Sequence, residues 1–177
     1  MKNLAIIPAR GGSKRIPGKN IKNFLGKPII AYSVEAALKS ELFCEVIVST
    51  DDNEIAEVSK KYGATVPFMR SDENADDHAT LSDVIDEVTE SYTQRGDKFD
   101  YACCILPTSP LLTVQNLEKG FNLLASQKLD SVKPVAAFSY PIQRALKMEN
   151  GLVEMFQPEH KRTRSQDLEQ AYHDAGQ

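Results

Sequence analysis

The fold is decided by the stretch Leu4-Ala-Ile-Ile-Pro-Ala-Arg-Gly-Gly-Ser-Lys-Arg-Ile-Pro-Gly-Lys-Asn20, in which an apolar run leads straight into a loop of glycine and basic residues. Residues 4–7 are typical of a short buried strand. Gly11 and Gly12 allow the main chain to approach a ligand closely. The loop carries four cations: Arg10, Lys14, Arg15 and Lys19. Exposed backbone N–H groups surrounded by positive charge favour a polyphosphate ligand.

Two better-known phosphate motifs fit this loop poorly. A Walker A loop has glycine where this chain has Ser13, and Ser or Thr where it has Asn20. The dinucleotide fingerprint is absent, because Gly11 and Gly12 are adjacent. A solvated basic turn is the alternative interpretation. The position directly after a buried strand favours phosphate binding.

Composition limits the classes of function. The 177 residues predict one domain over residues 1–177, and 41% hydrophobic with 26% charged residues is ordinary for a globular protein. A net charge of −4 disfavours nucleic-acid binding and suits a small anionic ligand at the basic loop. We find no membrane-spanning run and no signal peptide. The adjacent Cys103 and Cys104 in an apolar run predict reduced core thiols and hence a cytoplasmic protein.

Short apolar runs alternate with helical patterns along the chain. Strands are predicted at residues 4–7, 45–49, 101–106 and 131–135. Helices are predicted at residues 28–39, 52–62, 80–95 and 113–126. This alternation predicts an α/β fold with a doubly wound, mostly parallel, Rossmann-like sheet and ligands at the carboxyl ends of its strands.

The pattern changes after about residue 138. Residues 143–148 and 152–156 flank Glu149-Asn150-Gly151, which predicts a late β-hairpin closed by an Asn-Gly turn. Such a hairpin is expected to serve as an arm or lid. Residues 159–170 are polar and basic and lack an apolar helical stripe.

Several motifs together resemble one enzyme family. Ile7-Pro-Ala-Arg-Gly-Gly-Ser-Lys-Arg-Ile-Pro-Gly-Lys-Asn20, Val48-Ser-Thr-Asp51, Leu106-Pro-Thr-Ser-Pro110 and Arg164-Ser-Gln-Asp-Leu168 resemble the cytidylyltransferases that make CMP-activated nonulosonic acids. The wider family includes CMP-sialic acid and CMP-Kdo synthetases. Tyr101-Ala-Cys-Cys-Ile105, Phe138-Ser-Tyr-Pro-Ile-Gln-Arg-Ala-Leu146 and Ala171-Tyr-His-Asp-Ala-Gly-Gln177 look most like the pseudaminic acid branch.

The resemblance implies a nucleotide-diphospho-sugar transferase-like fold and a defined reaction. CTP condenses with a nine-carbon 2-keto sugar acid, whose anomeric hydroxyl attacks the α-phosphorus and releases pyrophosphate. Mg²⁺ or Mn²⁺ is the expected cofactor, and a homodimer is expected for the full-length protein, with the hairpin reaching a neighbour. Positioning and charge stabilisation dominate such transfers, which agrees with a loop of glycines and cations.

The resemblance also implies which residues hold the nucleotide. Lys19 and Arg10 are the expected catalytic cations, and Arg10 lies where its planar fork could meet a phosphate. A surface lysine and a salt bridge or helix cap are their respective alternatives. The predicted nucleotide-binding residues are Ala9, Arg10, Gly11, Gly12, Ser13, Lys19, Asn20, Arg70 and Thr80.

The sugar site is expected to differ from that of sialic acid synthetases. Those enzymes usually carry glutamine at the position of Leu106, and leucine makes no side-chain hydrogen bond. This disfavours neuraminic acid and is compatible with the more deoxygenated pseudaminic acid. The predicted sugar-binding residues are Leu106, Gln143, Arg144, Arg162, Arg164, Tyr172 and His173. For Gln143 and Arg144 a simple hairpin surface is the alternative.

Metal ligands are not identified. The acidic run 72–77 is better interpreted as a solvated loop and helix start than as a metal site. Asp51 is either a ligand contact or a helix cap. In the resembling family the metal carboxylates follow the position of Gly176, so they are expected beyond Gln177. We therefore expect a chain that lacks its C-terminal portion, binds CTP and turns over weakly or not at all.

Other functions stay open. Sialic acid or legionaminic acid could be the acceptor instead of pseudaminic acid. An inactive nucleotide-binding protein is the alternative of another class. A Rossmann oxidoreductase is disfavoured by the absent fingerprint.

Overall fold

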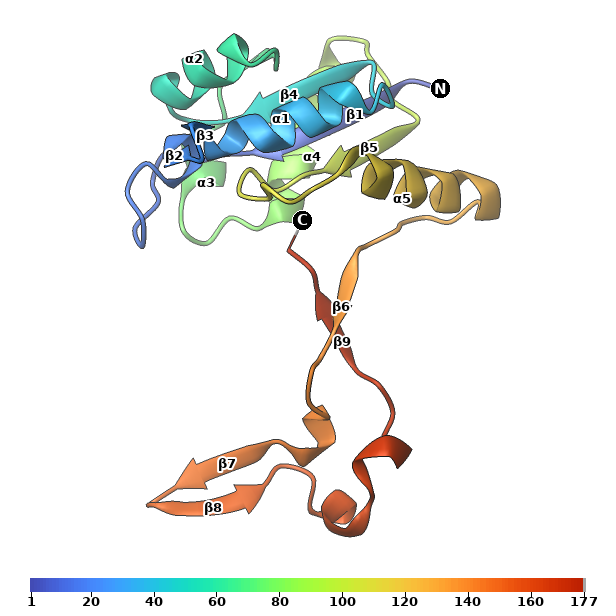
Figure 1. Ribbon diagram of the computed structural model, residues 1–177. Helices are drawn as coiled ribbons and strands as arrows, with labels where there is room; N and C mark the ends of the chain where they lie inside the picture. Colours follow the sequence, from blue (N-terminus) through green and yellow to red (C-terminus); the bar gives the residue numbers. More distant parts are fainter. Residues whose placement is uncertain (177) are drawn as a thin grey trace. The chain divides into compact units, whose positions relative to one another are not determined.

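The computed structural model describes residues 1–176, which separate into two compact units, residues 1–132 and residues 133–176 (Figure 1). Each unit has its own strands and its own hydrogen-bonded ladders. The expectation of a single domain over residues 1–177 stays a prediction. Among the described helices, none has both the length and the apolar character needed to cross a membrane.

The first unit is built on a parallel sheet. Strand β1 (Asn3–Pro8) lies between β4 (Glu45–Ser49) and β5 (Tyr101–Cys104), and both pairings are parallel. Ile6 of β1 stands opposite Ile47 of β4 and Cys104 of β5. These three strands confirm the predicted sheet, although β5 ends before residue 106.

The fourth predicted strand, at residues 131–135, is wrong. Residues 131–134 lie outside any strand, and residue 135 begins β6 (Val135–Ala137) in the second unit. There β6 pairs antiparallel with β9 (Tyr172–Asp174). Proline at position 134 has no N–H to donate to a ladder, which explains why the apolar run does not form a strand earlier.

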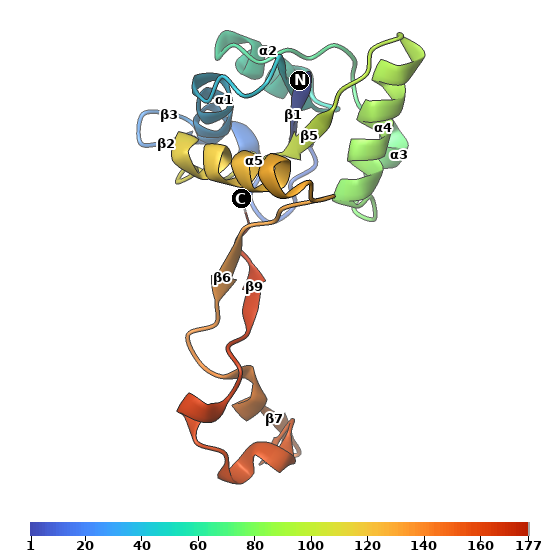
Figure 2. The ribbon, with the colours of Figure 1, turned by 90° about the vertical axis from the view of Figure 1, so that its right-hand side faces the viewer.

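Helices cover both faces of the parallel sheet, with α1 and α5 on one side and α4 on the other (Figure 2). The helices are α1 (Ile29–Lys39), α2 (Asn53–Lys61), α3 (Asp72–Ala75), α4 (Leu81–Gln94) and α5 (Val114–Gln127). The four predicted helices are confirmed to within one or two residues at each end, whereas the short α3 was not predicted. The doubly wound α/β class is therefore confirmed.

Strand alternation explains the two-sided core. Ala5 and Ile7 pack with the α1 residues Ile30 and Val34, while Leu4 and Ile6 form a second cluster that includes Val88 of α4. Side chains of successive strand residues point to opposite faces, so a continuous apolar run fills both layers.

The second unit consists of two antiparallel ribbons joined by 3-10 turns. Besides β6 and β9, strand β7 (Leu146–Glu149) pairs with β8 (Leu152–Met155). Asn150 and Gly151 have φ of 52° and 79°, as a two-residue hairpin turn requires, so the predicted Asn-Gly hairpin is confirmed. Strand β7 begins later than predicted because Ile142–Arg144 form a 3-10 turn. The other 3-10 segments are Pro158–Arg162 and Ser165–Asp167.

Candidate functional site

A cleft of about 790 Å³ opens in the first unit where β1 ends. It is lined by parts of residues 8–20, 70–84 and 106–108, which follow β1, β4 and β5 along the chain. Its volume falls within the range of small-molecule sites. Seven predicted site residues line it: Arg10, Ser13, Lys19, Asn20, Arg70, Thr80 and Leu106.

The remaining nucleotide-binding candidates lie beside the cleft. Ala9 is buried in the core, and its N–H donates to Ser49 O at 2.9 Å. The N–H of Gly11 donates to Asp51 Oδ1 at 2.9 Å, so the start of the loop is tied to the end of β4. A Cβ on Gly11 would lie 2.6 Å from Asp52 Oδ2, which explains the need for glycine there, whereas Gly12 has open space.

Arg10 is held by acceptors from a distant loop. Its Nη2 lies 2.9 Å from Asp77 Oδ1, and its Nη1 donates to the carbonyl oxygen of Asp76. Lys14 forms an ion pair with the other oxygen of Asp77. Lys14 first, and Arg10 in addition, lower the pKa of Asp77. In the structure Arg10 therefore forms a salt bridge, which is the alternative to phosphate binding given above, and both residues of this ion pair line the cleft.

Asn20 carries an unused acceptor. The residue is 3% exposed although it lines the cleft, and its Nδ2 donates to Arg10 O at 3.0 Å. Its Oδ1 has no hydrogen-bond partner among residues 1–176. A buried acceptor without a partner costs about 1–3 kcal/mol, so a donor from a ligand in the cleft would relieve that cost.

Arg70 is a buried cation in the cleft wall. It is 7% exposed, its Nε donates to Ser49 Oγ at 3.0 Å, and its Nη2 donates to Ser49 O. Burial lowers its pKa, while the charges of Asp51 and Glu87 oppose that effect. These bonds fix the plane of the guanidinium group, so Arg70 presents a rigid donor rather than a mobile one.

Thr80 and the acidic run are occupied by helix and turn contacts. Thr80 Oγ1 accepts from Asp83 N at 3.3 Å, and Thr80 N donates to Asp83 Oδ2 at 2.7 Å, which is a capping box at the start of α4. Asp76 Oδ1 accepts from the N–H groups of His78 and Ala79 at 2.7 Å each. These contacts agree with the interpretation of residues 72–77 as a loop and helix start.

The carboxylates of the described chain do not form a metal centre. Within residues 1–176, no group of three His, Cys, Asp or Glu side chains could hold a metal ion. Asp52 caps α2 through bonds to Glu54 N and Ile55 N, and Asp51 holds Gly11. The described residues therefore do not by themselves fit a resident Mg²⁺ or Mn²⁺.

Leu106 is the sugar-site candidate that belongs to the first unit. Its carbonyl oxygen accepts from the fully buried Ser33 Oγ at 2.8 Å, which ties the Pro107-Thr-Ser-Pro110 turn to α1. Sequence reasoning did not identify Ser33. The available signal was a single serine among the apolar residues of a predicted helix.

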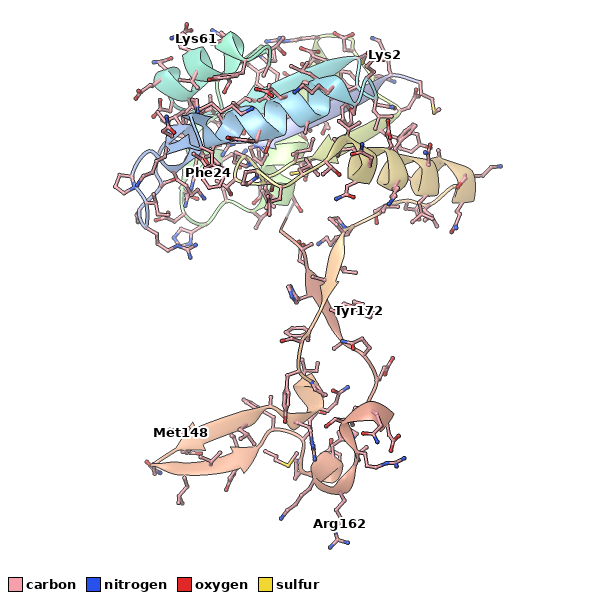
Figure 3. All side chains as sticks on the ribbon, viewed as in Figure 1. Lys2, Phe24, Lys61, Met148, Arg162 and Tyr172 are labelled. Atoms are coloured by element: carbon pink, nitrogen blue, oxygen red, sulfur yellow. The ribbon has the colours of Figure 1, made fainter. Side chains whose placement is uncertain are left out.

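The other sugar-site candidates belong to the second unit. Gln143 Nε2 donates to Glu169 O at 2.9 Å, and Arg144 Nη1 donates to Ser165 Oγ at 3.2 Å. His173 packs edge-to-face with Phe138 at 4.9 Å between ring centroids. The remaining candidates are exposed: Arg162, Arg164 and Tyr172. Figure 3 shows Arg162 extending away from its 3-10 turn.

Comparison with known proteins gives a consistent result. A sequence profile described as cytidylyltransferase matches residues 4–177. Pseudaminic acid cytidylyltransferase of Campylobacter jejuni is 48% identical over 177 residues, which cover 99% of this chain and 76% of that enzyme. CMP-N,N'-diacetyllegionaminic acid synthase of Legionella pneumophila is 37% identical over 138 residues, covering 77% of this chain and 60% of that enzyme.

Solved structures agree on the fold. CMP:2-keto-3-deoxy-manno-octonic acid synthetase complexed with CTP superimposes with a TM-score of 0.62 at 28% identity, covering 78% of this chain and 54% of that one. A 4-diphosphocytidyl-2C-methyl-D-erythritol synthase superimposes with a TM-score of 0.64 at 14% identity, covering 86% and 66%. The chain thus spans about three quarters of the Campylobacter relative's length and about half of the first solved structure's.

Proposed function

The chain belongs to the cytidylyltransferase family, and from this premise we propose that the protein transfers CMP from CTP to the anomeric hydroxyl of a nonulosonic acid and releases pyrophosphate. Pseudaminic acid is the proposed acceptor. The 48% identity to the Campylobacter enzyme over nearly the whole chain supports this choice. Glycan biosynthesis at the cell surface or on flagellin is the proposed use of the product.

The observation that carries the proposal is the cleft at the end of β1, which four cations of residues 10–19 line together with Arg70 and Asn20. Asn20 Oδ1 is buried without a partner in the free protein, so we propose that Asn20 shifts on binding and that a ribose hydroxyl or the exocyclic amine of cytosine donates to this oxygen. The guanidinium of Arg70, held by Ser49, lies in the same cleft wall and is proposed to face the base. We therefore propose that the nucleoside end of CTP occupies this part of the cleft.

The triphosphate end is proposed to lie among the cations of the same cleft. Arg10, Lys14, Arg15 and Lys19 all line it. Positive groups held in place stabilise the negative charge that develops when the α-phosphorus is attacked and pyrophosphate leaves. Lys19 and Arg10 are the proposed catalytic residues.

A divalent metal ion is proposed to enter with the substrate. Mg²⁺ commonly binds through substrate phosphates with only one or two protein carboxylates, which is compatible with a described chain that lacks a three-ligand cluster. Mg²⁺ or Mn²⁺ would supply further charge neutralisation on the triphosphate. The steps assigned here to Lys19 and Arg10 do not depend on it.

The experiment compares two lysines of one segment. In the full-length enzyme, Lys19→Ala should lower kcat/KM by roughly 100- to 1,000-fold, the loss typical of a removed charge-stabilising group. Lys22→Ala removes a lysine that does not line the cleft and should leave kcat/KM within twofold. Pyrophosphate release with CTP and pseudaminic acid is the readout. Equal kinetics for wild type and Lys19→Ala would contradict the assignment.

A ligand panel separates the alternatives. Thermal stability should rise with CTP and not with ATP or NAD, since only a ligand that binds the native state stabilises it. Release of pyrophosphate with pseudaminic acid separates an enzyme from an inactive nucleotide-binding protein. Sialic and legionaminic acids are compared with pseudaminic acid in the same assay. A preference for pseudaminic acid is what the predicted sugar site, with Leu106 and the six candidates of the second unit, leads us to expect.

We further propose that the β7–β8 hairpin pairs with a second copy of the chain. Leu146 and Met148 of β7 share one face with Val153 and Met155 of β8, and the first three of these side chains are more than half exposed. The opposite face carries the Lys147–Glu154 ion pair at 3.1 Å. A two-fold partner presents the same apolar face, so both faces are buried together.

Two aspartate substitutions on β8 test the dimer. Val153→Asp places a charge on the apolar face and should convert dimer to monomer in sedimentation experiments. Leu152→Asp, on the opposite face, is the matched control and should keep the dimer. A monomeric wild type, or equal dissociation in both variants, contradicts the proposed interface. The cytoplasm is the proposed location, in line with the unpaired thiols Cys44, Cys103 and Cys104 of the described chain.

A further inference from the structure

The loop before α4 contributes only acceptors to the cations of the cleft. Nη1 of Arg10 donates to Asp76 O, with Ala75 O at 3.5 Å, and Nη2 contacts Asp77. The second oxygen of Asp77 meets Lys14. A carboxylate that bridges two cations, next to two carbonyl oxygens, offers the same pattern of acceptors as a phosphate group.

The loop is held in the conformation that makes these contacts. Asp76 Oδ1 accepts from His78 N and Ala79 N at 2.7 Å each, which closes a tight turn. The capping box of Thr80 and Asp83 anchors the loop to α4. Asp77 is thus presented to Arg10 by a structured segment about 65 residues away along the chain.

The contact is accessible and therefore replaceable. The side chains of Arg10 and Asp77 are 34% and 38% exposed, and that of Lys14 is 80% exposed. Ion pairs at this level of exposure are weak, and salt screens them. An anion with more charge than one carboxylate can take over the same donors.

We propose that Asp77 is an internal competitor of the nucleotide's phosphates: its carboxylate occupies Arg10 and Lys14 in the free protein, and CTP must displace it. The inference rests on the proposed function, because it assigns the displaced position to the triphosphate. Binding of CTP then releases the segment Ala75–Asp77 from the basic loop. The phosphodiester of the CMP-sugar product carries less negative charge than the triphosphate of CTP and competes less well, so the returning carboxylate favours release of the CMP-sugar.

Direct binding measurements on a charge-matched pair of variants test the proposal. Asp77→Asn should bind CTP about tenfold more tightly than wild type, the scale expected from losing two exposed ion pairs. Asp72→Asn removes the same charge from the same acidic run, where no ion pair to Asp72 is found among the described residues, and should change the affinity less than twofold. Asp77→Glu keeps a carboxylate and should stay close to wild type.

Salt and a second probe distinguish the possible failures. High salt should reduce the difference between Asp77→Asn and wild type, because it screens the competing pairs. Inorganic pyrophosphate, titrated in parallel, should show the same gain for Asp77→Asn. If neither protein binds CTP while the gain for pyrophosphate persists, the competitor is supported and the proposed nucleotide specificity fails.

The opposite results overturn the inference. Unchanged or weaker binding of both probes by Asp77→Asn, with native circular dichroism, would mean that Asp77 positions Arg10 for the ligand instead of competing with it. Should Asp77→Asn fold poorly, Asp77→Ser is the replacement and carries the same two outcomes.

Discussion

The two units of this chain differ in how they bury apolar surface. Every buried apolar residue of the described chain lies between residues 4 and 107, in the first unit. Within residues 133–176 no residue is buried, and Leu146, Met148, Leu152 and Phe156 are all more than half exposed. The first unit therefore has a core of its own, whereas two-stranded ribbons without a core are marginally stable in isolation.

Topology explains the difference. A parallel sheet between two layers of helices buries both faces of its strands, so the continuous run of β1 is fully used. A two-stranded ribbon has one ladder and two open faces. Apolar side chains of the first unit are therefore buried and stabilise its fold. Those of the second unit stay exposed and are available for association.

The largest effect is expected from truncating one apolar side chain in each unit. Ile6→Ala removes a fully buried side chain from β1 and should lower the free energy of unfolding by about 2–5 kcal/mol. Met148→Ala, at 77% exposure in the single chain and outside the core of the first unit, should change the free energy of unfolding of the first unit by less than about 0.5 kcal/mol. Denaturant unfolding monitored on the first unit gives both values. Similar losses would mean that the second unit is part of the same core.

A smaller effect is expected at the cleft of the first unit. Gly11→Ala places a Cβ 2.9 Å from Asp52 Cβ, so the loop must move, at a cost of about 1–3 kcal/mol. Gly12→Ala meets nothing within 4 Å and is the control. We expect only Gly11→Ala to lose stability in calorimetry of the free protein. Equal behaviour of the two variants would show that the loop is not tied to Asp52.

The hairpin turn of the second unit should respond locally. Gly151→Ala forces alanine to a φ of 79°, which costs about 1–2 kcal/mol. Hydrogen exchange of the β7 and β8 amides should accelerate, while that of β1 stays unchanged. Gly120→Ala in α5 has open space around its Cβ, and alanine is more stable than glycine inside a helix. This variant should therefore raise the stability of the chain, whereas Gly151→Ala lowers it. Faster exchange in β1 would indicate that the units unfold together.

The smallest effect is the change of stability with pH that comes from the thiol of Cys103. It is expected in the first unit alone, because no cysteine lies in residues 133–176. Burial, with a contribution from Cys104, raises the pKa of Cys103 from 9.0 to about 11. Below pH 9 both states keep the proton; between pH 9 and 11 only the unfolded thiol ionises, so stability falls. At pH 9.5 the loss should stay below about 1 kcal/mol. Cys103→Val should flatten this part of the pH profile.

Much of the first unit could be predicted because its signals are local. Thr80 and Thr113 cap helices that follow them directly, and Gly63 and Gly96 end helices with φ of 97° and 85°. The strand predicted at residues 131–135 failed for a local reason, the missing N–H of the proline at position 134, and for a non-local one. Its ladder partner Asp174 lies some 40 residues downstream in an antiparallel ribbon, and periodicity carries no information on such a pairing.

The basic loop of the candidate site could be predicted from the sequence, whereas the residues that contact this loop could not. The glycines and cations of residues 10–20 are adjacent in sequence, so their common role could be inferred. The contact of Arg10 with Asp77 depends on how two loops meet in space. The buried state of Asn20 likewise follows from packing, since nothing in its sequence neighbourhood marks it as buried.

The bond from Ser33 to the carbonyl of Leu106 gives the cleft two walls with different responses to solution conditions. The wall carried by Leu106 is pinned from inside the molecule, at a serine that water does not reach. The wall carried by Arg10 is held by charges in contact with solvent. Raising the ionic strength should therefore weaken the ion pairs of Arg10 and increase the mobility of that wall. The wall next to Leu106 should keep its position.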